Sequence, residues 1–123
     1  MWQGREIINL NEFLALDDAT VEIAPLNEHG VFYPNYHVAI FNDGVFSLWG
    51  NPAKTENGWR WSFDYDWRNG GGGSFPHKND KIHTNKSEII NDALSIAQRY
   101  NFPMDDVRRM VGKSRVVQQT LFD

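Results

Sequence analysis

The regular alternation of aromatic and polar residues from Trp59 to Arg68 constrains the fold of this chain more than any other feature of the sequence. The aromatic positions are Trp59, Trp61, Phe63, Tyr65 and Trp67, and the polar positions between them are Arg60, Ser62, Asp64, Asp66 and Arg68. Successive side chains of a β-strand point to opposite faces, whereas a helix would distribute both classes around its axis. The segment therefore predicts a strand whose aromatic face is buried in a core, against a partner or against a ligand.

A β-hairpin is predicted before this strand. The apolar runs Tyr36–Phe41 and Val45–Trp49 flank Asn42-Asp43-Gly44, and glycine accepts the positive φ that a tight hairpin turn requires. Thr20–Ala24 alternates in the same way as a half-buried strand and predicts a first strand. Together with the aromatic strand, these segments predict an antiparallel meander of about four strands.

The connecting segments are predicted from their turn and cap residues. Asn11 is expected to cap a short helix that ends at Leu16. Gly50–Asn57 contains a proline and is expected to be a long connection between strands. Gly70–Gly73 is expected to end the sheet, and the polar segment Ser74–Asn85 that follows is expected to be irregular.

Two helices are predicted after this segment. Apolar residues recur at helical spacing from Lys86 to Tyr100, and Asn85 and Glu88 have the spacing of a capping box. Pro103 suits the first position of a second helix. The apolar face of that second helix is expected to consist of Val107, Met110 and Val111.

The sequence therefore predicts a single α+β domain over residues 1–123, in which an antiparallel sheet of about four strands is followed by two C-terminal helices packed on one face. We expect the helix Lys86–Tyr100 to cover the aromatic face, because a helix and a sheet each bury one apolar face. Two alternatives for that face are a stacking platform for nucleic-acid bases and a subunit interface. Lys113–Asp123 is predicted either as an extension of the last helix or as a terminal strand.

The composition bounds the class of protein. The 123 residues include no cysteine, which excludes disulfides and thiolate chemistry, and a net charge of −4 argues against bulk binding to nucleic acid. Residues 1–67 carry three bases and ten acids, a net charge of −7, whereas residues 68–123 carry nine bases and six acids, a net charge of +3. This asymmetry is ordinary surface charge, or a sign that one half contacts a basic partner or that the other half binds an anion.

The N-terminal segment Met1–Leu16 lacks the basic and apolar pattern of a signal peptide. No apolar run reaches the roughly 20 residues that a membrane-spanning helix needs. We therefore expect a cytoplasmic protein that does not associate with a membrane.

The predicted binding residues lie mainly in and after the glycine run. The sequence contains no nucleophile motif, dinucleotide-binding loop or zinc-ligand spacing, so we expect no catalytic residue, no metal and no cofactor. Loops on a rigid scaffold often carry binding residues, and the basic side chains here favour an anionic ligand. The predicted ligand-binding residues are Arg68, Gly70, Gly71, Gly72, Gly73, Ser74, His77, Lys78, Lys81, His83, Arg108 and Arg109.

Asp64 and Asp66 form a second candidate group on the polar face of the aromatic strand. Their α-carbons are expected about 7 Å apart. Paired carboxylates can bind a divalent metal or perform acid–base chemistry, but Arg60 and Arg68 flank them, and we expect these arginines to form ion pairs with them.

The stretch from Trp59 to Tyr100 resembles a module of small accessory proteins of phages, plasmids and partition loci. The resemblance lies in the aromatic strand WRWSFDYDW, the glycine-rich NGGGGSFP and the capped helix NKSEIINDALSIAQRY. It implies a mobile-element origin and a protein that binds and blocks a component of host defence. It implies no catalytic residues.

Three hypotheses about function follow. The first is a non-enzymatic binding protein, expected to be a homo-oligomer, that sequesters a host protein or a small anionic ligand such as a nucleotide. The second is a nucleic-acid-binding accessory protein that uses Arg108 and Arg109. The third is a hydrolase that uses Asp64 or Asp66 together with a histidine.

Overall fold

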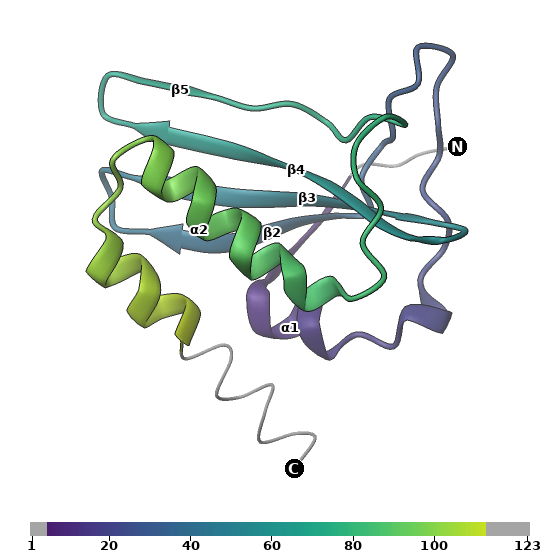
Figure 1. Cartoon of the computed structure of the whole chain (residues 1–123), viewed down its shortest axis with the longest axis horizontal. Coiled ribbons are helices and arrows are strands. Elements are labelled where there is room, and N and C mark those ends of the chain that lie inside the picture. The colour runs from purple at the N-terminus through teal and green to yellow at the C-terminus, as the bar shows by residue number, and fades with distance from the viewer. Residues whose placement is uncertain (1–4, 113–123) are drawn as a thin grey trace.

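The aromatic segment forms β4 (Gly58–Trp67), one of five strands in a mixed sheet (Figure 1). The computed structural model describes residues 5–112. The strand order is β1-β2-β3-β4-β5; β1 pairs with β2 in parallel and all other neighbours are antiparallel. The other strands are β1 (Glu6–Asn9), β2 (Tyr36–Asn42), β3 (Ser47–Thr55) and β5 (Gly70–Gly72). The α+β class is confirmed, with five strands instead of about four and one parallel pair.

The predicted first strand, Thr20–Ala24, is wrong. A short 3-10 helix, η1 (Asp18–Thr20), occupies its start, and residues 21–24 lie outside the sheet. The strand beside β2 is instead β1, which precedes the helix α1 (Leu10–Ala15). A four-residue strand carries almost no periodic signal, and its partner is some thirty residues away in the sequence.

The predicted connection Gly50–Asn57 is also wrong, because β3 continues to Thr55 and pairs with β4 along its whole length. Pro52 does not interrupt the strand. Its carbonyl accepts a hydrogen bond from the Asn35 amide at 3.0 Å, so its nitrogen faces the same side, beyond the end of β2. No ladder donor is therefore lost there. The predicted hairpin between β2 and β3 is confirmed.

The cap of α1 is Asn9 and not Asn11. The Asn9 side chain accepts a hydrogen bond from the Glu12 amide at 2.8 Å, and the Glu12 carboxylate accepts one from the Asn9 amide at 3.1 Å. This reciprocal pair is a capping box. Asn11 lies within the helix.

The two predicted C-terminal helices are present. A 3-10 turn, η2 (Lys86–Glu88), leads into α2 (Ile89–Arg99), and residues 104–112 form the second helix. Asn85 caps the first turn through the Ser87 amide at 3.0 Å, but the Glu88 carboxylate contacts His83 and does not complete a capping box. Asn101 has a φ of 61°, as expected of a residue that ends a helix.

In the second helix, Val107 and Val111 are buried. Met110 is 45% exposed, so its predicted place on the apolar face is wrong. The alternatives for Lys113–Asp123 lie outside the described residues.

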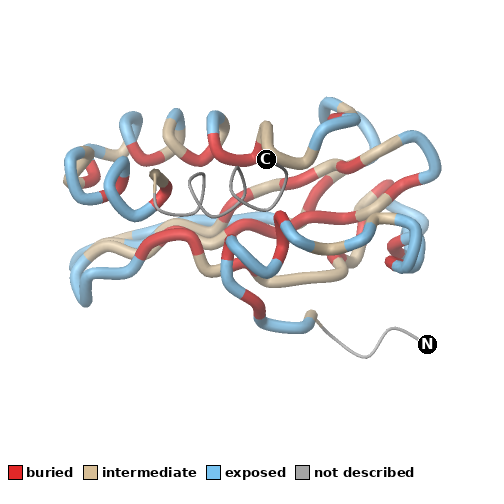
Figure 2. The backbone as a smooth tube through the Cα atoms, turned by 90° about the horizontal axis from the view of Figure 1, so that it is seen from below, coloured by how far each residue is buried: buried red, intermediate tan, exposed pale blue. Residues whose placement is uncertain are grey.

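The helices cover one face of the sheet (Figure 2). Trp59, Trp61 and Phe63 are buried there together with Ile89 and Ala93, which confirms the predicted core. Burying one large aromatic ring contributes about 4–6 kcal/mol, whereas an exposed ion pair contributes about 0–1 kcal/mol. The aromatic face therefore dominates the attachment of α2.

The aromatic face continues at its other end as a stack of three rings. Tyr65 stacks on Tyr100 with ring centroids 4.1 Å apart, and Trp67 lies 5.5 Å from Tyr100. The hydroxyls of Tyr65 and Tyr100 are hydrogen-bonded at 2.9 Å, and this bond raises the pKa of Tyr65. The stack connects the end of α2 to β4.

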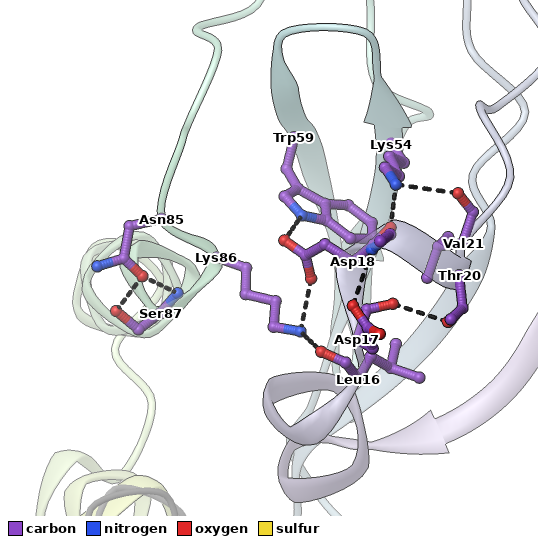
Figure 3. A network of polar contacts seen from close by, with 11 residues as sticks. Leu16, Asp17, Asp18, Thr20, Val21, Lys54, Trp59, Asn85, Lys86 and Ser87 are labelled. Carbon is purple, nitrogen blue, oxygen red and sulfur yellow. Dashed lines mark hydrogen bonds and ion pairs between the residues drawn. The ribbon is translucent and has the colours of Figure 1, made fainter. Parts of the chain in front are cut away.

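Asp18 connects the 3-10 helix η1 to the core (Figure 3). Its carboxylate accepts hydrogen bonds from Trp59 Nε1 at 3.0 Å and from Lys86 Nζ at 2.8 Å, and Lys54 Nζ donates to the carbonyl of Val21 at 3.0 Å. Burial alone would raise the pKa of Asp18, but the two hydrogen bonds and the charges of Lys86 and Lys54 lower it overall. These contacts hold η1 against Trp59 of β4 and Lys86 of η2, which are distant from it in the sequence.

No helix within residues 5–112 is both long enough and apolar enough to span a bilayer.

Candidate functional site

The face of the sheet opposite α2 is only partly covered (Figure 2). Loop residues cover one end of it, where Ala24 and Phe32 pack on Ala53 of β3. The other end contains a hollow of about 460 Å³. Its lining residues are Ser47, Trp49, Asp64, Tyr65, Asp66, Gly71 and Gly72. We refer to this feature as the open-face hollow.

Strand register brings the polar residues of the hollow together. Trp49 of β3 lies opposite Asp64 of β4, and Ser47 lies opposite Asp66. Residues two apart on a strand share a face, so these four side chains form a square on two neighbouring strands. The third strand, β5, adds no side chain because it consists of glycine, and this leaves the hollow open.

The glycine run of β5 is required by the side chains of β4. A Cβ atom at Gly71 would lie 2.6 Å from Asp66 Oδ1 and 2.7 Å from the carbonyl oxygen of Tyr65, and a Cβ at Gly73 would collide with Asp64 Oδ1. The prediction that this run ends the sheet is therefore wrong, since Gly70–Gly72 is its edge strand. The same contacts show that the Oδ1 atoms of both aspartates lie toward the glycine strand.

A polar network borders the hollow. Asn51 is fully buried; its Oδ1 atom lies 2.9 Å from His37 Nδ1 and accepts a short hydrogen bond from Arg5, while its Nδ2 atom donates to the Ser74 carbonyl at 3.3 Å. Arg5 Nη1 also lies 3.1 Å from His37 Nδ1, so Arg5, His37 and Asn51 form one polar cluster. The His37 ring stacks on Trp49 at 4.3 Å with an interplanar angle of 5°, which fixes the plane of the indole.

The two aspartates of the hollow differ in their partners. Asp64 Oδ2 forms an ion pair with Arg5 Nη1 at 3.5 Å and lies 3.9 Å from His37 Nδ1. Asp66 is exposed, and among residues 5–112 no cation lies within ion-pair distance of it. The expected pairing with Arg60 is wrong, because Arg60 Nε donates to the carbonyl of Asp80 at 3.0 Å. The hollow therefore carries a negative charge.

The predicted binding residues fall in three separate parts of the fold. Arg68 is exposed in the turn before β5, and Gly71 and Gly72 line the open-face hollow. Arg108 and Arg109 lie on the helix 104–112, where Arg109 forms an ion pair with Asp106 at 3.0 Å.

The third part is the loop after β5, which hydrogen bonds attach to the rest of the fold. The Ser74 carbonyl accepts a hydrogen bond from Ser62 Oγ, the His77 amide donates to Asp80 at 2.8 Å, and the Lys78 amide donates to the Gly30 carbonyl at 2.8 Å. The loop therefore lies apart from Arg108 and Arg109, and the predicted set does not form one site.

His83 has a structural environment. It is 5% exposed and stacks on Trp61 with ring centroids 4.0 Å apart. Its Nδ1 atom lies 2.8 Å from Glu88 and its Nε2 atom lies 3.4 Å from Asp92, whose carboxylate also accepts from Trp61 Nε1 at 2.8 Å. These contacts attach the start of α2 to β4.

A second hollow, of about 290 Å³, lies on the helix side of the sheet beside His83. Lys81 and Arg99 line it together with Ser95, Asp80 and Asp92. Within the described residues both carboxylates already have hydrogen-bond donors, whereas Lys81 and Arg99 are exposed and have no carboxylate partner. We refer to it as the helix-side hollow.

Sequence patterns single out Asp64, Asp66, Gly71 and Gly72 of the open-face hollow but not the polar network that borders it. The alternation in β4 predicts that Asp64 and Asp66 lie on the polar face of the strand. Arg5, His37 and Asn51 come from three separate segments, and no spacing in the sequence relates them.

Comparison of the chain with models of protein families, with curated proteins and with solved structures finds no match. The resemblance to mobile-element proteins therefore stays a prediction. Among residues 5–112 there is no group of three or more histidine, aspartate or glutamate side chains placed to hold a metal ion.

Proposed function

We propose that the chain is a non-enzymatic binding protein that engages its partner through the open-face hollow. One observation carries this proposal: an all-glycine strand leaves a hollow on a sheet face that no helix of residues 5–112 covers, and a tryptophan and two aspartates line it. A concave site with an aromatic wall and a few convergent polar groups is typical of a recognition site. Trp residues are also enriched where interfaces are energetically most important.

The polar groups beside the hollow favour binding over catalysis. A hydrolase of the kind considered above would use Asp64 with His37, which lie 3.9 Å apart. Asp64 is paired with Arg5, and His37 Nδ1 lies within hydrogen-bond distance of both Arg5 and Asn51. Both groups are thus committed to neighbours within the protein, which keeps the wall of the hollow rigid.

A partner-capture experiment with a charge-reversed variant tests the proposal. The immobilised chain is exposed to host lysate, and bound proteins are quantified by mass spectrometry for wild type, Asp66→Lys and Asp105→Lys. The control carries the same charge change on the exposed face of the helix 104–112. We expect a partner that wild type and the control capture equally and that Asp66→Lys captures more than tenfold less, because placing like charges at an interface costs several kcal/mol. Equal capture by both variants would contradict the proposal.

A small anionic ligand is a second candidate, and it is favoured by the helix-side hollow. Lys81 and Arg99 line this hollow without a carboxylate partner among the described residues. Titration with ATP, followed by NMR, should shift resonances near Lys81, and Arg99→Ala should weaken the effect. Absence of any saturable shift would remove this candidate.

The remaining hypotheses are also open to direct tests. Binding to nucleic acid through Arg108 and Arg109 predicts a salt-sensitive gel shift that is lost in the double alanine variant. Homo-oligomerisation predicts a mass above 14.2 kDa in sedimentation. The proposed context, in which a mobile-element protein sequesters a host defence component, rests on the resemblance of residues 59–100.

A further inference from the structure

We infer that the group recognised by the open-face hollow is the guanidinium of an arginine side chain on a basic protein partner. This inference rests on the proposed function and specifies which chemical group of the partner the hollow binds. Three features of the hollow carry it: the orientation of the carboxylates, the aromatic wall and the distribution of charge.

The Oδ1 atoms of both carboxylates lie against the backbone of the glycine run. A Cβ atom added at Gly71 would lie 2.6 Å from Asp66 Oδ1, and one added at Gly73 would collide with Asp64 Oδ1, so no side chain at either glycine position covers these oxygens. Neither Oδ1 atom accepts a hydrogen bond from a side chain of residues 5–112, because the Arg5 and His37 contacts of Asp64 are made by Oδ2. Two free carboxylate oxygens on adjacent same-face positions suit a ligand with several donors.

Trp49 provides a flat wall next to these oxygens. His37 is stacked parallel to its ring and fixes its plane, and Trp49 still lines the hollow. A guanidinium is planar, stacks on aromatic rings and has five N–H donors in a rigid fork, whereas an ammonium is a compact and strongly hydrated point charge. A planar wall beside two separated acceptors therefore matches arginine better than lysine.

The charge distribution supports a protein source for this group. The strands β1 to β4 lie within the part of the sequence up to residue 67, which has a net charge of −7. Among residues 5–112, no lysine or arginine lines the open-face hollow, and Arg5 is already paired with Asp64. The charge of Asp66 in the hollow, unpaired within the described part of the chain, attracts a basic surface on a partner and raises its association rate.

NMR titration of the ¹⁵N-labelled chain tests the inference with defined compounds. The compounds are acetyl-arginine amide, acetyl-lysine amide and acetyl-citrulline amide, the last of which has nearly the shape of arginine without its charge. We expect acetyl-arginine amide to shift the Trp49 indole and the Gly71 amide saturably, with a dissociation constant on the order of millimolar. Lysine should bind more weakly, and citrulline should produce no saturable shift.

Asp66→Asn and Asp105→Asn form a matched pair of variants for this titration. Both remove one negative charge from an exposed position, but only the first alters the hollow. We expect Asp66→Asn to weaken arginine binding about fivefold. The control should change it less than twofold, because distant exposed charges are screened by salt. Thermal unfolding of both variants verifies that the fold is retained.

The outcomes distinguish this inference from the proposed function. Equal shifts with arginine and citrulline, shifts confined to α2, or no shift at all would overturn the arginine assignment. If a captured partner is lost with Asp66→Lys but its arginines can be replaced without effect, the arginine assignment fails and the proposed function stands. If capture does not depend on the open face, both fail.

Discussion

Replacing Gly71 with alanine tests the structural origin of the open-face hollow. Gly71 lies on the edge strand β5, opposite Asp66. A Cβ atom there would lie 2.6 Å from Asp66 Oδ1, 2.7 Å from the Tyr65 carbonyl oxygen and 3.1 Å from the Asp66 Cα atom. The carboxylate could rotate away, but two of these three atoms belong to the backbone of β4. The added methyl group must therefore push β5 away from β4.

The expected loss of stability follows from two opposing effects. Forcing a methyl group into occupied space costs about 1–3 kcal/mol. Replacing glycine with alanine also restricts the unfolded chain, which stabilises the folded state by about 0.4–1 kcal/mol. The net effect of Gly71→Ala is a decrease of about 1–2 kcal/mol in the free energy of unfolding, and steric repulsion is the larger effect.

Urea denaturation measures this change, and Gly112→Ala is the control. Gly112 lies in the helix 104–112, and within the described part of the chain no neighbouring segment comes within 4 Å of a Cβ atom added there. Alanine at that position should increase the free energy of unfolding by about 0.5–1 kcal/mol, because alanine is the better helix former. If Gly71→Ala is as stable as wild type, β5 does not pack against β4 as described and the explanation of the hollow is wrong.

Two further predictions concern the ends of the core. Asn9→Ala should lower the free energy of unfolding by about 1 kcal/mol because it removes the cap of α1, whereas Asn11→Ala should leave it nearly unchanged. Urea denaturation of both variants measures the two free energies. Equal losses would contradict the assignment of Asn9 as the cap. The lowered pKa of Asp18 means that its ionised form stabilises the fold above the pKa of the unfolded chain, and this contribution is lost as the pH falls through the folded-state pKa. The loss of unfolding free energy caused by Asp18→Asn, measured by urea denaturation, should therefore be larger at pH 7 than at pH 3. An equal loss at both pH values would show that the charge of Asp18 does not contribute to stability.

The sequence predicts the fold well where the signal is local. The alternation from Trp59 to Trp67 predicts β4 and its buried face, because five large rings at period two have few other arrangements. The periodicity of Lys86–Tyr100 similarly predicts the helix that covers them. Both elements depend on residues close together in the sequence.

The errors arise where tertiary pairing decides the structure. The strand β1 is short and gains its hydrogen bonds from β2, which is distant in the sequence. Pro52 suggested a loop, but its nitrogen lies beyond the end of the neighbouring strand. The glycine run suggested a break in the sheet, whereas glycine is required there by the side chains of β4. In each case the deciding contact involves another segment.

The candidate site was likewise predictable where the signal is local and not where it depends on contacts between distant segments. The polar face of β4 and the importance of the glycine run were predictable, but the sign of the charge was not, because the basic residues of the second half lie elsewhere in the fold. The network of Arg5, His37 and Asn51 depends on the meeting of β2, β3 and the residue before β1, which only the sheet register shows.

Cysteine labelling tests most directly the claim that the open face is the binding surface. The chain has no cysteine, so Ser47→Cys and Ser95→Cys each introduce a single thiol. Ser47 lines the open-face hollow and Ser95 lines the helix-side hollow. Labelling rates with a thiol reagent are measured for the free chain and for its complex with the captured partner. We predict that the partner strongly protects the cysteine at position 47 and leaves the one at position 95 as reactive as in the free chain. Protection at position 95 with unchanged labelling at position 47 would contradict the claim.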